Sequence, residues 1–110
     1  MAIAEFWQRG ESLDYTNSTE ATIPANTIVT IGSHIGVTGC PIEPGQVGSL
    51  HVCGVFEMPK TGTAAIEMGA AVYFDGTGIT GTSGSGAIEA GYAAAPAAAS
   101  DTTVLVKIRG

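Results

Sequence analysis

The sequence predicts an all-β protein, a small single-domain β-barrel or sandwich of about seven or eight short strands with an extended N-terminal arm and little helix. Two observations predict this class. Apolar residues recur with a period of two, and clusters of Gly, Pro, Asn and Asp interrupt them roughly every ten residues. The length of 110 residues gives room for one domain. We expect residues 1–10 to form the arm and residues 11–110 the β domain.

Each expected strand places its apolar side chains on one face, because successive side chains of a strand point to opposite sides. A β-branched run at residues 27–31 adds to this signal, since Thr, Val and Ile favour strands. In chain order, the expected strand residues are Leu13 and Tyr15; residues 27–31; Ile35 and Val37; Leu50, Val52, Phe56 and Met58 on one shared face; Val72 and Phe74; Ile88, Ala90 and Tyr92; and Val104, Val106 and Ile108.

Turn residues separate these runs. Asp75-Gly76 follows an alternating apolar run and predicts a hairpin, because both central positions of a type I′ turn favour positive φ. Helix signals are weak. Residues 64–68 are long enough for one helical turn, and the Ala-rich residues 93–100 are interrupted by Pro96, so we expect a strand end and then a loop or one turn there.

The expected core is thin, because the chain has three Phe, three Tyr and one Trp and much of its apolar content is Ala. Stabilisation by burial scales with apolar area, and domains of this size bury little. We therefore expect self-association to add stability.

The net charge of −6, with four Lys and Arg against ten Asp and Glu, argues against a nucleic-acid-binding or membrane-surface role. No stretch is apolar enough to span a bilayer, and the first residues lack the basic and apolar regions of a signal peptide, so we expect a cytosolic origin. In that compartment Cys40 and Cys53 are expected as free thiols, although a strand pairing that brought them together would allow a disulfide.

Two motifs resemble nucleotide-binding sites but lack features that these sites require. Residues 76–81 (GTGITG) spell a dinucleotide-binding fingerprint, but the Gly- and Ser-rich residues that follow will not hold the helix that it needs. Gly81 and Gly86 have P-loop spacing, but Ala87 and Ile88 stand where Lys and Ser or Thr are required.

The soft metal ligands are His34, Cys40, His51 and Cys53. Their spacings match no common zinc site, and a Cys-His nucleophilic pair lacks polar partners. We expect no metal, no cofactor and no catalytic residue.

The N-terminal arm holds the sharpest candidate site. Phe6 and Trp7, followed by Arg9, are residue types enriched at interface hot spots, and large aromatic side chains are rarely left exposed without a partner. They either bind a partner or fold back onto their own sheet.

Residues 54–60 (GVFEMPK), 68–75 (MGAAVYFD), 35–37 (IGV) and 97–109 (AAASDTTVLVKIR) resemble a family of small tailed-phage and prophage proteins, the capsid cement or head decoration proteins. The resemblance extends from about Ala21 to the end. Members often carry an inherited label as phage recombinases of the RecA/RadA kind. This chain lacks the P-loop Lys and the basic face that such a label requires.

The resemblance implies a β-rich homotrimer on the outside of an expanded phage head, at or near three-fold positions, assembled in the host cytoplasm. Its partner would be the major capsid protein, with no nucleic acid and no membrane. In a related decoration protein an N-terminal arm contributes to the capsid contact, and by analogy Phe6, Trp7 and Arg9 become capsid-binding candidates.

Two other functions stay open. A head-surface module that binds carbohydrate or host would use exposed aromatic side chains such as Tyr15, Tyr73 or Tyr92 as a stacking platform. A recombination-associated nucleotide-binding protein is the remote alternative.

Overall fold

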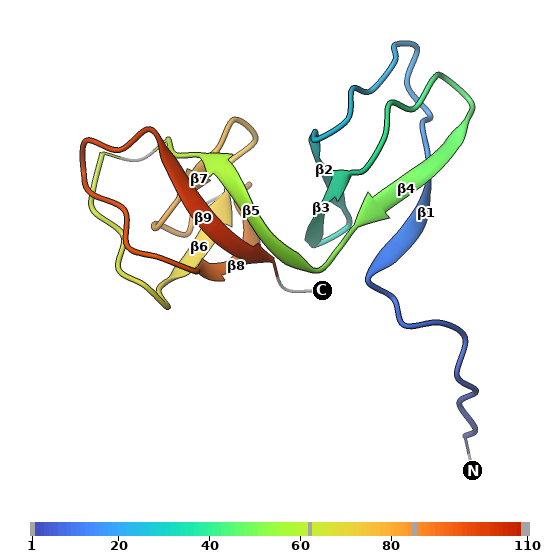
Figure 1. Cartoon of the computed structure of the whole chain (residues 1–110), viewed down its shortest axis with the longest axis horizontal. Coiled ribbons are helices and arrows are strands. Elements are labelled where there is room, and N and C mark those ends of the chain that lie inside the picture. The colour runs from blue at the N-terminus through green and yellow to red at the C-terminus, as the bar shows by residue number, and fades with distance from the viewer. Residues whose placement is uncertain (1, 62, 85, 109–110) are drawn as a thin grey trace.

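Figure 1 shows the computed structural model, which describes residues 2–61, 63–84 and 86–108. Within these residues the secondary structure consists of nine strands in two antiparallel sheets, without helix, so the all-β class is confirmed. The first sheet has the order β1-β4-β3-β2 and the second β5-β9-β8-β6-β7. The strands are β1 (Ser12–Thr16), β2 (Ile28–Ile31), β3 (His34–Thr38), β4 (Val47–His51), β5 (Gly54–Pro59), β6 (Ala71–Phe74), β7 (Ile79–Thr80), β8 (Ile88–Ala93) and β9 (Thr103–Ile108).

The expected single run from Leu50 to Met58 is wrong, because the chain changes sheet within it. Strand β4 ends at His51, and β5 begins at Gly54 in the other sheet (Figure 1). Gly54 has a φ of +121°, a conformation that residues with a Cβ rarely adopt. The periodicity continues across the crossing, so it gives no sign that the hydrogen-bonding partner changes.

The single helical turn for which residues 64–68 are long enough does not form. Ile66 instead forms an isolated antiparallel bridge with Ala97, in which each N–H donates to the other carbonyl at 2.8 Å. Ile66 is buried there, so cross-chain pairing and burial together override the weak local helix signal. The loop expected after Ala93 is present.

The two halves of the chain repeat one topology. Strand β1 pairs with β4 and β2 with β3 in the first half, as β5 pairs with β9 and β6 with β8 in the second. An antiparallel bridge joins Ile23 to Ile42 in the first half, and the Ile66–Ala97 bridge takes the same place in the second. Short turns follow the bridge residues Ile23, Ile42 and Ile66 and contain Asn26, Gly45 and Gly69, each with positive φ. The fold is therefore an internal duplication.

Strand β7 is the feature that breaks the repeat. It pairs with the outer side of β6, and Ile79 also forms a parallel bridge with Lys60, directly after β5. The second sheet thus curls until its two edges meet. In the first half the equivalent connection is the turn Gly32-Ser33, which is too short to supply such a strand.

One apolar cluster joins the two sheets. Ile35 and Val37 of β3 contribute the first sheet's share, and the other buried members come from the second half of the chain. Three of those members from the second half are Ala, in agreement with the expected thin core. The members from the second half are Met58, Ile66, Val72, Phe74, Ile79, Ala90, Ala93, Ala97, Val104, Val106 and Ile108.

A buried side-chain amide helps to stabilise the first half of the chain. Asn17, which is fully buried, donates through Nδ2 to the carbonyls of Ala21 and Ile42, both at 2.8 Å. Its Oδ1 accepts from the N–H and the hydroxyl of Thr19 at 2.9 and 2.6 Å. The side chain uses its full hydrogen-bonding capacity, so its burial costs little and orders the loop after β1.

Candidate functional site

The N-terminal segment lies apart from the sheets. Residues 2–10 have no regular secondary structure, and in Figure 1 they run away from the body below β1. Gly10, with a φ of +79°, lies just before β1 and sets the direction in which the segment leaves.

The predicted site residues are exposed in this segment. Phe6 is 85% and Trp7 91% exposed, and neighbouring Ile3 is 82% exposed. Arg9 forms a long ion pair of 3.9 Å with Glu11, and both side chains face water. The aromatic side chains do not fold back onto the sheet in this structure. Such a set of exposed apolar side chains next to one cation is a surface suited to binding.

The four candidate metal ligands are not brought together. Within the described ranges, no group of three or more His, Cys, Asp or Glu side chains is arranged to hold a metal ion. Cys40 and Cys53 are free thiols, and Cys53 lies in the short link between β4 and β5. The His51 ring contacts Ser12 instead, with Nδ1 at 3.1 Å from the hydroxyl oxygen, and lies 6.1 Å from the ring of Phe56.

The glycine-rich motif forms a hairpin between β6 and β7. Asp75 N–H donates to the Gly78 carbonyl at 3.0 Å, so the central turn residues are Gly76 and Thr77 rather than Asp75 and Gly76. Gly76 has a φ of +103°. A type I′ turn needs positive φ at both central residues, and Thr77 does not have it, so the type I′ expectation is wrong.

Asp75 holds this hairpin together. Its carboxylate accepts hydrogen bonds from the Thr77 N–H at 2.9 Å, the Thr61 hydroxyl at 2.7 Å and the Gly78 N–H at 2.9 Å. These donors lower the pKa of Asp75 from 3.8 to about 2 because they stabilise its charged form. The loop donates its N–H groups to its own carboxylate, an arrangement unlike a dinucleotide-binding turn.

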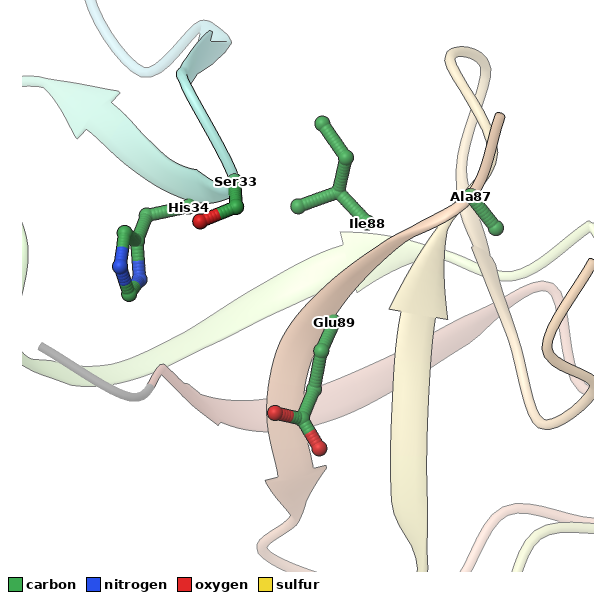
Figure 2. A pocket seen from close by; sticks show the side chains of 5 residues that line it. All are labelled: Ser33, His34, Ala87, Ile88 and Glu89. Carbon is green, nitrogen blue, oxygen red and sulfur yellow. The ribbon is translucent and has the colours of Figure 1, made fainter. Parts of the chain in front are cut away.

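A shallow cavity of about 350 Å³ lies where the two halves meet. It is lined by Ser33 and His34, at the β2–β3 turn and the start of β3, and by Ala87, Ile88 and Glu89, at the start of β8 (Figure 2). The set includes a hydroxyl, an imidazole and a carboxylate, but in Figure 2 the side chains of Ser33, His34 and Glu89 do not converge on one point. Nucleophilic catalysis needs such convergence, so we interpret this cavity as a gap at the contact between the two halves and not as a catalytic site.

A second cavity was not predicted from the sequence. It has a volume of about 250 Å³ and lies between β2 and β5, where Ile28, Val37, Phe56 and Met58 supply apolar walls and Asn26, Glu57 and Pro59 complete the lining. Ile28 and Phe56 are only half-buried, so apolar surface remains accessible. Periodicity marks these residues as apolar, but only the arrangement of the two sheets brings them together.

The tyrosines do not form one platform along a single sheet. Tyr15 lies on β1 in the first sheet, whereas Tyr73 and Tyr92 lie on β6 and β8 in the second.

The described residues contain no helix long and apolar enough to cross a membrane.

Comparison with known proteins gives one family. The family model described as phage cement protein matches residues 7–108, which includes Trp7, Arg9 and both halves of the duplicated fold. Searches of curated proteins and of solved structures returned no match. Because the match covers nearly the whole chain, the expected resemblance is confirmed, and this chain belongs to the phage cement protein family.

Proposed function

We propose that this chain is a non-enzymatic structural protein of the phage virion that binds the outside of the expanded head as a trimer and stabilises it. The family match over residues 7–108 carries the proposal. A protein that binds only the expanded lattice stabilises that lattice by mass action. Three linked copies add avidity, so each single contact can be weak. Its partner is the major capsid protein, and assembly takes place in the host cytoplasm.

The binding site in this proposal is the N-terminal arm, residues 1–10, where Phe6, Trp7 and Arg9 are the candidate residues and Trp7 and Arg9 are the capsid anchors. Trp7 is the largest exposed apolar side chain on the described surface, and Arg9 offers a charged donor two residues on. Burying a large apolar side chain contributes about 1.5–3 kcal/mol. Because its apolar side chains are exposed, the arm can meet a partner without disturbing the sheets.

Reconstitution on cement-free expanded capsids tests the proposal. We expect purified protein to bind at close to one copy per capsid subunit, counted by quantitative mass spectrometry, and to raise the temperature at which the heads rupture. Trp7→Ala should weaken binding by roughly 30-fold, as for an interface hot spot. Met68→Ala is the matched control, because Met68 is also exposed, at 70%, but lies in the body. Absence of the protein from particles and failure to bind capsids would refute the proposal.

A further inference from the structure

The arm contains a geometric problem that the proposed function leaves open. In an extended segment, neighbouring side chains point to opposite faces. An arm that turns Trp7 and Arg9 toward the capsid therefore turns Phe6 away from it. Phe6 is 85% exposed in a single copy, so a second apolar surface is needed to cover it.

The open edge of the first sheet offers a place for an added strand. Strand β2 pairs with β3 on one side and is the outermost strand of its sheet. In the duplicated second half, β7 covers the corresponding edge of β6. The first half has only the two-residue turn Gly32-Ser33 at that point, so its own chain supplies no equivalent of β7.

The hydrogen-bonding groups of this edge face outward at known positions. Thr38 N–H donates to the Thr27 carbonyl at 3.0 Å, which marks this pair as hydrogen-bonded in the β2–β3 ladder. Such pairs alternate along an antiparallel ladder. The N–H and C=O groups of Ile28 and Thr30 therefore point away from β3, toward an incoming strand.

The cavity between β2 and β5 lies beside this edge. Ile28 and Val37 are directly paired and share a face, and both line the cavity with Phe56. A side chain paired with Ile28 or Thr30 on an added strand projects on the same face. The cavity volume of about 250 Å³ exceeds the roughly 150 Å³ of an apolar cavity known to hold benzene, so a phenyl ring can enter.

We propose that the N-terminal arm of one copy adds as a strand to β2 of a neighbouring copy, with Phe6 in the cavity and Trp7 and Arg9 turned outward. Residues 2–10 can span about 30 Å when extended, which is long enough to reach beyond their own sheet. Each copy has one arm and one open β2 edge, so arms can be exchanged reciprocally in a dimer or head to tail around a closed ring such as the proposed trimer. Only the role of the outward face rests on the proposed capsid binding; the self-association stands by itself.

Sedimentation of the free full-length chain over a concentration series tests this exchange. We expect the wild type to assemble, and Phe6→Ala and deletion of residues 2–9 to raise the dissociation constant by at least about tenfold. Trp7→Ala is the matched control and should leave assembly unchanged while it weakens capsid binding. Thr30→Pro removes an N–H that faces the open side, so it should block assembly and spare the β2–β3 ladder, which circular dichroism can verify.

Three outcomes would overturn the inference. The first is a wild type that stays monomeric in solution, and the second is assembly that survives Phe6→Ala and the arm deletion. The third is a Thr30→Pro variant that assembles normally but no longer binds capsids, which would indicate that a capsid segment and not a neighbouring arm pairs with the β2 edge. A protein that binds capsids but fails the sedimentation test would refute the arm exchange and leave the cement function standing.

Discussion

Replacement of Asn17 by Ala tests the account of the first half most directly. The variant removes two donations from Nδ2, to Ala21 and Ile42, and the two hydrogen bonds that Oδ1 accepts from Thr19. Each buried donation is worth about 1 kcal/mol net. Thr19 is exposed and regains part of its loss from water, so its two bonds contribute about 1 kcal/mol together.

The sum is a loss of about 3 kcal/mol, a large part of the usual 5–15 kcal/mol of a domain. It stays near this value because both acceptors have another donor in the variant: Ile42 accepts from the Ile23 N–H, and Ala21 accepts from the Thr19 hydroxyl, whose single hydrogen is released from Oδ1. For a domain of this size, the expected fall in Tm is roughly 12–24 °C.

Thermal unfolding should be followed by circular dichroism, because Trp7 is 91% exposed and its fluorescence will not report on the core. Thr19→Ala is the matched control and should lose about 1 kcal/mol or less, since it keeps both buried donations. If Asn17→Ala is no more destabilising than Thr19→Ala, the amide is not what holds the loop, and the reasoning fails.

Three further substitutions have definite expected outcomes. Gly48→Ala would place a Cβ 2.5 Å from Ile42, so it should cost about 1–3 kcal/mol in denaturant unfolding, whereas Gly84→Ala meets no atom within 4 Å and should cost far less. Asp75 has a lowered pKa, so its contribution to the free energy of unfolding is full above pH 3.8 and is lost as pH falls through about 2. Asp75→Asn should remove this acid dependence of stability, and the effect is small because the side chain is exposed. Gly10→Ala strains a positive φ next to an exposed segment, so it should redirect the arm and weaken assembly, while the Tm of dilute, unassembled protein stays unchanged. Equal costs at Gly48 and Gly84, an unaltered acid transition, or a lowered Tm of dilute Gly10→Ala protein would each contradict the corresponding argument.

The sequence predicted the strands better than their arrangement. A period of two located β9, because this strand buries one face and leaves the other more exposed. In β8 the expected shared face of Ile88, Ala90 and Tyr92 is wrong, since a register shift against β6 leaves Tyr92 exposed while Ala90 and Ala93 are buried. It could not show that the chain changes sheet at Gly54, since alternation records burial and not the identity of the pairing partner. The duplication was also missed. Its repeated signal, an Ile three residues before Asn26, Gly45 or Gly69, is short, and the fourth copy has Ala97 in place of Ile.

The candidate site was predicted as residues but not as a geometry. Phe6, Trp7 and Arg9 were recognisable because large aromatic residues outside any strand pattern need a partner. The cavity that we propose binds Phe6 was not recognisable, because it combines Ile28 of the first sheet with Phe56 of the second. Such a combination depends on long-range packing that local patterns do not encode.

The unequal halves lead to a last prediction about local stability. The main apolar cluster takes two of its buried members from the first sheet, Ile35 and Val37, and the others from the second half. Regions with few buried contacts open at lower free energy, so amides of β1 and β2 should exchange hydrogen faster than those of β9 in dilute protein. The outward N–H groups of Ile28 and Thr30 should exchange fastest and become protected at high concentration, when a neighbouring arm pairs with them. Equal protection of both sheets in dilute protein would show that the first half is stable without a partner, and protection of Ile28 and Thr30 that does not depend on concentration would exclude a pairing strand from another copy.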